Sequence, residues 1–451
     1  MKAVRLHDFH EMPRVDEVPE PVISGPFDVI VRVGGAGVCR TDLHIIEGQW
    51  DAAMGTPLPY ILGHENAGWV HEVGSAVTNV AVGDTVILHP TPTCGLCRAC
   101  RAGDDMHCVA STFPGLSTDG GMAQYLLTSA RACVRLDPAT RPEDVAALAD
   151  AGITAYHAVR KAVPLLYPGT TAVVIGAGGL GHIGIQCLAA LTAARIVVVD
   201  RNPDALKLAE QLGAEATIVA DGRQVTAVAD MTGGRGADVV LDFVAEQGAE
   251  ADGWQMTAPG GSYFVIGYGG TLHLPTLDII STERNVIGNI VGTYNDLAEL
   301  MALAHAGRVT LHTRTYPLDA AADALADLDA GRVRGRAILV PLSPGGRPPD
   351  PRSGRPGTRR LPSPLLPRPS VAPAQSRRHG ATPGPPKRAP WDAPSSLTST
   401  PSFLGRSGSV QTARGALPEH LRSLPIWPKN CASALRRAPC CWPELTSWPR
   451  R

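Results

Sequence analysis

A glycine-rich segment in the middle of the chain sets the narrowest limit on its fold. Residues 176–181 read Gly-Ala-Gly-Gly-Leu-Gly and directly follow the apolar stretch Thr171–Ile175. A second apolar stretch, Ile196–Val199, ends at Asp200, nineteen residues after the last of these glycines. The residues between the two stretches favour a helix. A strand, a tight turn, a helix and a second strand in this order form a unit whose two strands lie parallel.

The same rhythm continues beyond this unit, whereas the first part of the chain consists of short strands broken by Gly and Pro. We therefore predict an α/β protein with a mostly β part and a doubly wound parallel sheet. The expected boundaries are 1–154 for the β part, 155–291 for the parallel sheet and 292–342 for a return to the β part. Further strands are expected at Asp28–Val33, Ala67–Val73, Thr217–Val219, Val239–Phe243, Tyr263–Ile266, Val286–Val291 and Arg336–Val340, and helices at Pro203–Leu212 and Asn295–Gly307.

The glycine-rich turn is suited to bind the pyrophosphate of a dinucleotide. Glycines allow close approach of the backbone, and the free N–H groups that open the next helix favour a negative charge. Asp200 would accept hydrogen bonds from the adenosine ribose and repel a 2′-phosphate, so we predict NAD rather than NADP, although Arg201 is adjacent. A turn that closes the sheet without a ligand is the alternative. The predicted contacts here are Gly176, Gly178, Gly179, Leu180, Gly181, Asp200 and Arg201.

Four cysteines lie close together in the β part, separated by three, three and eight positions: Cys94, Cys97, Cys100 and Cys108. This spacing, among small and polar residues, lets four thiolates converge on one tetrahedral ion and leaves no position for a substrate. We predict a structural zinc. An iron–sulfur cluster is a competing use, but the last spacing is longer than in ferredoxin-type runs. Cys133 and Cys187 lie among apolar residues and are expected to be ordinary buried thiols.

A second set of metal-binding residue types includes Cys39, in Gly-Val-Cys-Arg-Thr-Asp, and His64, in Gly-His-Glu-Asn-Ala-Gly. Each alone also fits an ordinary buried side chain. Together with the four cysteines and the glycine-rich turn they resemble the zinc-dependent medium-chain alcohol dehydrogenases, in order from Met1 to about Leu342. The resemblance implies a GroES-like catalytic domain and a Rossmann domain for NAD. It also implies conversion of a primary or secondary alcohol to an aldehyde or ketone.

The resemblance supplies the ligands of a catalytic zinc. Cys39 and His64 match two of the family's ligands, and the third, often a cysteine, falls on Asp150. A carboxylate oxygen binds zinc at a comparable distance and preserves the charge balance. Glu65 also matches a position that can approach the metal, and a carboxylate of Asp150 that points to solvent is a further alternative. Three protein ligands would leave the fourth position for an alcohol oxygen.

The family's proton relay runs through a hydroxyl, the cofactor ribose and a histidine. The resemblance maps its two protein groups onto Thr41 and His44, which are three positions apart and would share one side of a helical turn. A helix cap at Thr41 and a surface position for His44 are the plain alternatives. Asp42 would fix the His64 ring, and Arg40 would bind the cofactor pyrophosphate.

The set of predicted cofactor contacts is completed by Thr154, Ile266 and Val291, of which Val291 falls where the family's chain passes the nicotinamide. Ile290 lies beside it, and Trp50 matches a position that lines the substrate pocket, although it also fits the core. An apolar lining favours a neutral, moderately hydrophobic alcohol but does not single out one substrate.

Charge and proline change abruptly near residue 342. Residues 343–451 carry 18 basic and four acidic residues and 22 of the 40 prolines, whereas residues 1–342 have a net charge of −15. We predict a disordered tail, because such a composition buries too little apolar surface. An acidic body argues against nucleic-acid binding by residues 1–342. The arginine pairs of the tail could attract polyanions, and the composition could also reflect an altered reading frame.

The first residues show no apolar segment of the kind found in signal peptides, and the stretch 172–191 carries five glycines, which favours a strand, turn and helix over a membrane span. We therefore expect a cytoplasmic enzyme, a homodimer or homotetramer, that binds two zinc ions per chain, NAD and a small alcohol. The alternatives are a polyol or amino-alcohol dehydrogenase on the same scaffold and a non-catalytic nucleotide- or nucleic-acid-binding protein.

Overall fold

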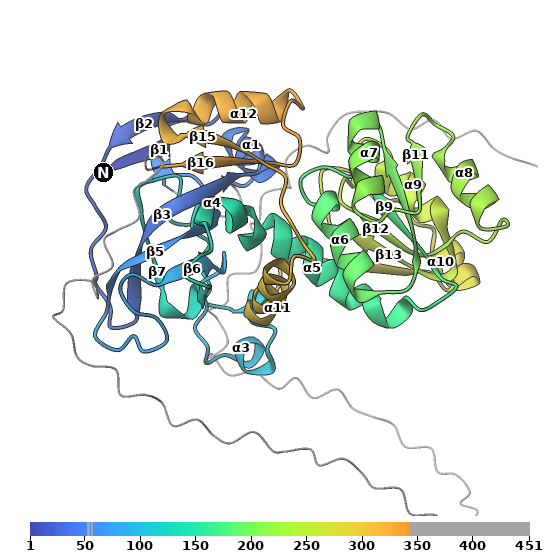
Figure 1. Cartoon of the computed structure of the whole chain (residues 1–451). Helices are drawn as coiled ribbons and strands as arrows, with labels where there is room; N and C mark the ends of the chain where they lie inside the picture. Colours follow the sequence, from blue (N-terminus) through green and yellow to red (C-terminus); the bar gives the residue numbers. More distant parts are fainter. Residues whose placement is uncertain (52–54, 56, 342–451) are drawn as a thin grey trace, which may run out of the picture. The chain divides into compact units, whose positions relative to one another are not determined.

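Six strands between residues 171 and 288 form one parallel sheet (Figure 1). The structure, a computed structural model, describes residues 1–51, 55 and 57–341. All of these residues belong to one unit of the chain, Met1–Pro362. In spatial order the strands of the sheet are β11 (Ala216–Val219), β10 (Arg195–Asp200), β9 (Thr171–Ile175), β12 (Ala237–Asp242), β13 (Thr257–Val265) and β14 (Asn285–Gly288).

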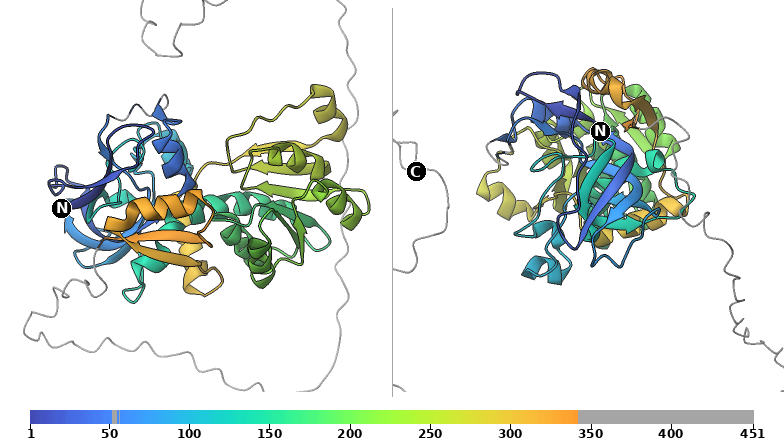
Figure 2. Two further views of the ribbon diagram at one scale, coloured as in Figure 1. Left: turned by 90° about the horizontal axis from the view of Figure 1, so that it is seen from above. Right: turned by 90° about the vertical axis from the view of Figure 1, so that its left-hand side faces the viewer.

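Both faces of the parallel sheet are covered, as the side chains of β9 show. Ala172 and Val174 pack into one hydrophobic cluster, whereas Val173 and Ile175 pack into another. Successive side chains of a strand point to opposite faces, so the uninterrupted apolar run of β9 needs a cover on each side. Helices flank the sheet on both sides in Figure 2.

The strand order predicts a binding site at the carboxyl ends of the central strands of this sheet. The chain runs outward from β9 through β10 to β11, and then continues on the other side of β9 with β12, β13 and β14. Ligands of open α/β sheets bind where the order reverses in this way, beyond the carboxyl ends of the strands. The glycine-rich turn leaves β9 at that point.

The remaining strands form two further sheets. A three-stranded sheet has the order β2 (Arg14–Glu17), β1 (Lys2–Leu6) and β4 (Tyr60–Ile61). The larger sheet has the order β15 (Thr313–Pro317), β16 (Arg336–Val340), β3 (Asp28–Val38), β5 (Glu65–Val73), β6 (Thr85–Leu88) and β8 (Cys133–Arg135), with β7 (Tyr125–Ser129) also paired to β3. Because β16 pairs with β3, the chain returns to its first sheet after completing the parallel one.

Eleven α-helices in the described residues connect or follow these strands. The α-helices are α1 (Arg40–Ile46), α3 (Arg98–Ala102), α4 (Pro142–Val145), α5 (Ala151–Ala162), α6 (Gly181–Leu191), α7 (Pro203–Gln211), α8 (Gln224–Met231), α9 (Ala249–Met256), α10 (Thr276–Thr282), α11 (Tyr294–His305) and α12 (Ala321–Asp329). Short 3₁₀ turns occupy Asp105–His107, Ala130–Ala132, Ala146–Ala149, Val163–Leu165 and Leu318–Ala320.

The predicted fold class is confirmed, since a mostly β part joins a parallel sheet with helices on both faces. The strand expected at Val286–Val291 is wrong at its end, because β14 stops at Gly288. Val291 has φ +44°, a left-handed conformation that a strand does not contain. The predicted disorder of residues 343–451 falls outside the described residues.

Candidate functional site

Four candidate metal ligands lie together although they come from distant parts of the sequence. Each of them offers one ligand atom, and these atoms all lie within 4.8 Å of one another: Cys39, His64, Glu65 and Asp150. Cys39 immediately precedes α1, Glu65 opens β5, and Asp150 immediately precedes α5. Three of the four are buried and Asp150 is partly buried. The arrangement therefore satisfies the distance requirement of a shared metal ion.

Small residues make this convergence of side chains sterically feasible. A Cβ on Gly37 would collide with the carboxylate of Glu65 on the neighbouring strand. Gly63, directly before His64, has φ +101° and packs against the backbone of Met122, so a larger residue would be both strained and obstructed. The backbone around Cys39 and His64 is thereby held close enough for their side chains to meet.

The cluster favours a positive charge. Burial by itself lowers the pKa of His64, but the carboxylates of Asp42 and Asp150 raise it well above its usual value. Asp42 Oδ1 lies 3.4 Å from His64 Nδ1, and Asp150 Oδ2 lies 3.5 Å from His64 Nε2. Among the described residues, neither ring nitrogen of His64 has a hydrogen-bond partner, although both are buried. A cation between Nε2 and the nearby carboxylate and thiol would satisfy this nitrogen.

The two acidic residues of the cluster differ in what already binds them. Glu65 Oε1 accepts a hydrogen bond from the backbone N–H of Ala151 at 3.0 Å, and Glu65 Oε2 forms a buried ion pair with Arg336. Both oxygens of Glu65 therefore have partners in the protein. The nearest ion-pair contact of Asp150 is the His64 ring itself, so Asp150 is the carboxylate better placed to bind a metal.

The four cysteines of residues 94–108 form a second cluster. Sγ of Cys100 lies 3.5 Å from that of Cys97 and 4.0 Å from that of Cys94. Sulfurs at the corners of a zinc tetrahedron are about 3.8 Å apart for a Zn–S bond of about 2.3 Å, so the spacing fits a metal and is too long for a disulfide. Backbone N–H groups of Cys100 and Val109 lower the pKa of Cys97 to about 6, which favours the thiolate that zinc requires.

The glycine-rich turn has the shape of a phosphate cradle. A Cβ on Gly181 would collide with the carbonyl oxygen of Gly176, which holds the turn tight. A Cβ on Gly178 would meet no atom within 4 Å among the described residues, so the backbone there faces open space. Asp200 Oδ2 accepts a hydrogen bond from the N–H of Ala177 at 2.6 Å, which fixes the carboxylate beside the turn. The helix expected after this turn is observed as α6, which begins at Gly181 with Leu180 as its N-cap residue.

A buried arginine connects this turn with the first metal cluster. Arg336, the first residue of β16, pairs with Glu65 and packs against Gly179. Its Nε is buried and has no hydrogen-bond partner among the described residues. A guanidinium with a free donor beside the turn adds positive charge where a pyrophosphate would be expected.

The two candidate relay residues face the same hydroxyl group. Thr41 Oγ1 lies 3.2 Å from the hydroxyl oxygen of Tyr268, and His44 Nδ1 lies 2.7 Å from it. Trp50 Nε1 donates to the same oxygen at 3.3 Å. Burial, and then the charge of Arg40, lower the pKa of His44, so its imidazole is neutral near pH 7.

The other predicted cofactor contacts have different environments. Thr154, Ile266 and Val291 are buried, whereas Ile290 is exposed. Arg40 lies 3.6 Å from Glu246, in the loop after β12. Arg201 donates a hydrogen bond to the side chain of Gln247 at 2.9 Å. Its guanidinium therefore points toward the same loop that carries Glu246.

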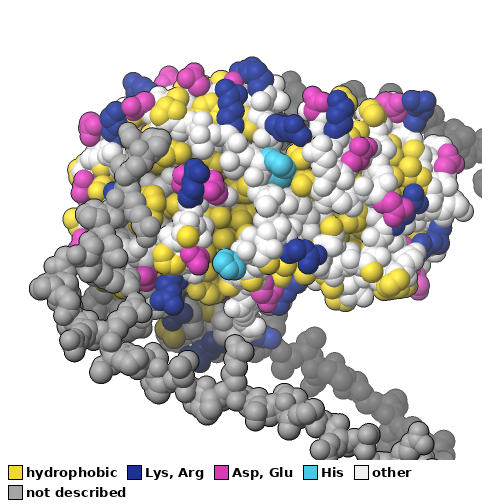
Figure 3. All heavy atoms as spheres, in the orientation of Figure 1, with side chains coloured by type: hydrophobic (Ala, Val, Ile, Leu, Met, Phe, Trp, Pro, Cys, Tyr) yellow, Lys and Arg dark blue, Asp and Glu magenta, His cyan; other side chains and the backbone are white. Residues whose placement is uncertain are grey.

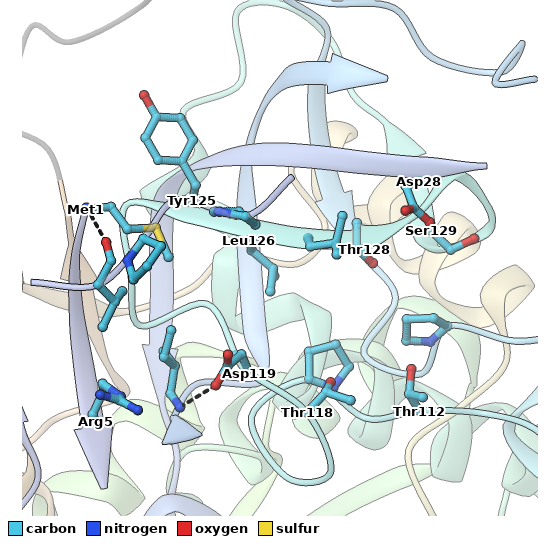
Figure 4. Close-up of a pocket in the computed structure, with 18 residues that line it drawn as sticks. Met1, Arg5, Asp28, Thr112, Thr118, Asp119, Tyr125, Leu126, Thr128 and Ser129 are labelled. Carbon is cyan, nitrogen blue, oxygen red and sulfur yellow. Dashed lines mark hydrogen bonds between the residues drawn. The ribbon is translucent and has the colours of Figure 1, made fainter. Parts of the chain in front are cut away.

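A pocket of about 670 Å³ lies elsewhere in the β part and contains none of the candidate residues (Figure 4). Its two acidic side chains already bind the backbone. Asp28 accepts hydrogen bonds from Ser24 and Gly25, and Asp119 accepts one from Ile61. The pocket therefore offers few free polar groups for chemistry.

Comparison with known proteins decides the family. Residues 25–138 match the alcohol dehydrogenase GroES-like domain, and residues 179–306 match the zinc-binding dehydrogenase family. An NAD-dependent alcohol dehydrogenase of Sulfurisphaera tokodaii is 34% identical over 352 residues, which is 76% of this chain and 100% of that protein. The chain belongs to the zinc-type medium-chain alcohol dehydrogenases.

Two further relatives of this dehydrogenase are an alcohol dehydrogenase of known structure and a D-arabinose dehydrogenase. The crystal structure of an alcohol dehydrogenase from Aeropyrum pernix has a TM-score of 0.74 and 45% identity, and the match covers 76% of this chain and 100% of that one. A D-arabinose 1-dehydrogenase (NADP(+)) of Saccharolobus solfataricus is 35% identical over 346 residues, which is 75% of this chain and 97% of that protein. The resemblance noted from the motifs is thus confirmed, together with the GroES-like and Rossmann-type parts of the fold.

The described surface of the dehydrogenase carries charges of both signs. Figure 3 shows basic and acidic side chains interspersed over the face it presents. Among the described residues, no helix combines the length and the apolar character needed to cross a membrane.

Sequence reasoning missed three side chains of the dehydrogenase that reach the candidate site: Arg336, Glu246 and Tyr268. The last two follow β12 and β13, at the carboxyl ends of central parallel strands where ligands bind. Because both residues follow predicted strands, the sequence could have indicated that they lie near the ligand. Arg336 gave no local signal, because its role depends on pairing with Glu65, 271 positions earlier.

Proposed function

We propose that this chain oxidises primary or secondary alcohols with NAD, and reduces the corresponding aldehydes or ketones, with the help of one catalytic zinc ion. The observation that carries this proposal is the convergence of Cys39, His64 and Asp150 within 4.8 Å. Enzymes that use zinc in catalysis commonly hold it with three protein ligands and leave a fourth position for substrate. Membership of the zinc-type dehydrogenases supports this reading of the cluster.

The donor set fits zinc: a thiolate, an imidazole and a carboxylate give a neutral sum with the ion, and the unpartnered Nε2 of His64 supplies the nitrogen. When bound, zinc would make the alcohol hydroxyl more acidic and polarise a carbonyl in the reverse direction. Asp42 orients the ring of His64 from the other side. Arg336 pairs with Glu65 and so already engages one oxygen of that carboxylate.

NAD fits the glycine-rich turn, because Gly178 faces open space and Arg336 offers a free donor beside Gly179. NAD would accept the hydride from the alcohol carbon. Asp200 would bind the adenosine ribose, while Thr41 and His44 would carry the alcohol proton away from the site. Arg40, Thr154, Ile266 and Val291 complete the proposed cofactor contacts.

Replacing Asp200 should relax the preference for NAD over NADP. In Asp200→Ala the carboxylate that would oppose a 2′-phosphate is gone, so the ratio of kcat/KM for NADP to that for NAD should rise at least about tenfold. Because both cofactors are measured with the same variant, any loss of affinity that comes from a loosened turn affects both values and does not change their ratio. Asp204→Ala, which removes an exposed carboxylate at the start of α7, should leave the ratio unchanged. An unchanged ratio in Asp200→Ala would show that this residue does not face the ribose.

Replacing one of the four cysteines of residues 94–108 should remove one metal ion without removing cofactor binding. We expect Cys97→Ser to bind about one zinc fewer per chain and to melt at a lower temperature, because a structural zinc contributes to folding. NADH affinity, measured by fluorescence titration, should be retained. Cys133→Ala, which alters a buried thiol outside both clusters, should keep the full zinc content. Iron in the purified protein would instead support an iron–sulfur cluster at the four cysteines.

The relative named D-arabinose 1-dehydrogenase makes a sugar or polyol substrate the second candidate. Trp50 packs edge-on against Tyr268 and matches the family position that lines the substrate pocket, where an apolar lining would favour a simpler alcohol. A panel of primary alcohols, secondary alcohols, sorbitol, arabinose and threonine, run with NAD and NADP beside a zinc measurement, tests both. NAD reduction dependent on simple alcohols, with about two zinc ions per chain, supports the proposal. Absence of activity on every alcohol and polyol would refute it.

We further propose the domain boundaries 1–154, 155–291 and 292–342, a cytoplasmic location and a homodimeric or homotetrameric state. The separate matches of residues 25–138 to the GroES-like domain and of residues 179–306 to the zinc-binding dehydrogenase family support a division into two parts. Size-exclusion chromatography with light scattering tests the oligomeric state.

A further inference from the structure

His89 is a buried histidine that belongs to neither metal cluster. It directly follows β6 and is only 2% exposed. Its Nε2 lies 2.9 Å from the carbonyl oxygen of Gly292, 203 positions later in the sequence. Its Nδ1 lies 3.0 Å from the carbonyl oxygen of Thr91 and 3.1 Å from the hydroxyl oxygen of the same residue. Both ring nitrogens therefore have partners within the protein.

The role of Nε2 can be assigned from these partners. A carbonyl oxygen only accepts hydrogen bonds, so Nε2 must carry a proton in order to bond to Gly292. Thr91 offers both a hydroxyl and a carbonyl to Nδ1, so this nitrogen has a partner with or without a proton. His89 is therefore a donor to the Gly292 carbonyl, and Thr91 holds its ring through the other nitrogen.

The residue before Gly292 has a strained backbone. Val291 has φ +44°, a left-handed conformation that a β-branched residue rarely adopts. It is buried, yet neither its N–H nor its C=O forms a hydrogen bond with another described residue. Strained backbone persists only where the surroundings fix it, and it is concentrated where ligands bind. Buried backbone groups need a partner, and a ligand at Val291 would provide one.

The chain is anchored on both sides of Val291. Before it, the N–H of Asn289 donates to the carbonyl at the end of β13 at 3.0 Å, and after it α11 follows. A Cβ on Gly292 would collide with Ile153 in the first turn of α5, so the backbone lies closely against that helix. Among the described residues, His89 is the one side chain that bonds to the backbone between these anchors.

This segment lies close to the proposed reaction site. It follows β14, at the carboxyl end of a parallel strand, where ligands of such sheets bind. Ile153, against which Gly292 packs, comes three positions after the proposed zinc ligand Asp150. The unpaired backbone groups of Val291 therefore belong to the region where cofactor and alcohol would meet.

We propose that His89 is a positioning residue for the nicotinamide half of the cofactor. By donating to the Gly292 carbonyl it fixes the peptide next to Val291, and it thereby holds the N–H and C=O of Val291 ready for a ligand. The carboxamide of nicotinamide is suited to such groups, because it both donates and accepts hydrogen bonds. The inference rests on the proposed function, which supplies NAD as the cofactor.

His89→Asn and His89→Gln form a matched pair of variants. The asparagine amide can replace Nδ1 but is too short to reach Gly292, whereas the glutamine amide can replace the Nε2 donor. We expect the Kd for NADH to rise at least about tenfold in His89→Asn but less than about threefold in His89→Gln. ADP-ribose, which is the cofactor without its nicotinamide, should bind to both variants within about twofold of the unmodified protein. Isothermal titration calorimetry on the zinc-loaded full chain measures these affinities.

The comparison of the two ligands separates positioning from folding. A general loosening of the protein would weaken NADH and ADP-ribose equally in His89→Asn, and this result would overturn the proposal. Unchanged NADH binding in His89→Asn would overturn it as well. His89→Phe, which keeps a ring but has no N–H, provides the same test should His89→Asn not fold.

Tyr294→Phe controls for the loss of another hydrogen bond near this segment. It removes a hydroxyl that donates to the carbonyl of Cys133 at 3.2 Å, and it should leave the affinities for both ligands unchanged. If the unmodified protein binds neither NADH nor ADP-ribose, the proposed function itself fails. If it binds both but oxidises no alcohol, the binding data still decide the role of His89.

Discussion

Asp150→Asn should lower the turnover number for alcohol oxidation by about a hundredfold or more. Loss of a residue that merely supports a metal ligand typically costs 10- to 100-fold, and Asp150 is proposed as a ligand itself. Asparagine keeps the shape but replaces a negative oxygen with a neutral amide, so the cluster holds one charge less against a divalent ion. Zinc content should fall from about two toward one per chain, measured by atomic absorption, while NADH still binds.

The experiment needs a control of the same chemical kind and a test of the competing ligand. Asp144→Asn changes an exposed carboxylate of α4, whose contact with Arg141 is a surface ion pair of 3.5 Å, and it should leave turnover and zinc unchanged. Glu65→Gln addresses the alternative. If Asp150→Asn keeps full turnover and two zinc ions whereas Glu65→Gln loses both, the ligand is Glu65.

The sequence predicts well those features of the site that depend on short spacing. The glycine-rich turn, the four cysteines and the neighbouring pair Thr41 and His44 are each contained in a short segment, and residue types there directly limit the local geometry. The turn after β9 needs glycine because Gly181 lies against the carbonyl of Gly176. Such requirements can be recognised without knowing the tertiary structure.

The rest of the site depends on contacts between distant segments. Nothing in the sequence pairs Glu65 with Arg336. Strand β3 pairs with both β5 and β16, and this order of strands brings the two side chains together in the interior. Tyr268 could be assigned to a loop but not to His44, because the contact requires the two parts of the chain to meet. Val291 has a positive φ that its β-branched side chain disfavours, so the strand pattern there extended too far.

Asp296→Asn should cause the largest loss of stability among these variants, about 2–4 kcal/mol near pH 7. Asp296 is a buried residue in the first turn of α11, and its carboxylate accepts four hydrogen bonds. Thr293 donates two, from its backbone N–H and its hydroxyl, both at 2.8 Å; His157 donates at 2.9 Å and Arg160 at 2.5 Å. An amide cannot accept at both ends of the side chain, and it leaves Arg160 with only its 3.4 Å ion pair to Glu299.

The pH dependence of this difference identifies its origin. Burial by itself raises the pKa of Asp296, but the hydrogen bonds from His157, Thr293 and Arg160 outweigh it and hold the pKa well below its usual value. A lowered pKa in the folded state means that the stabilisation is complete above the unfolded pKa of about 3.9 and is lost as the pH falls toward the folded value. The gap between wild type and Asp296→Asn, read from urea unfolding midpoints, should therefore be constant from pH 6 to 7 and narrow below about pH 4.

The control for Asp296→Asn is a carboxylate in the first turn of another helix that lacks such hydrogen-bond partners. It measures how much stability comes from the helix dipole alone. Asp323 lies exposed in the first turn of α12, and Asp323→Asn should cost at most about 1 kcal/mol. If the Asp296→Asn gap were equally small, or did not narrow in acid, the buried network would contribute little to stability. Because Tyr294, the next residue after Thr293, donates its N–H to Asp105 within the four-cysteine segment, loosening the start of α11 should also lower the melting temperature of the zinc-loaded protein.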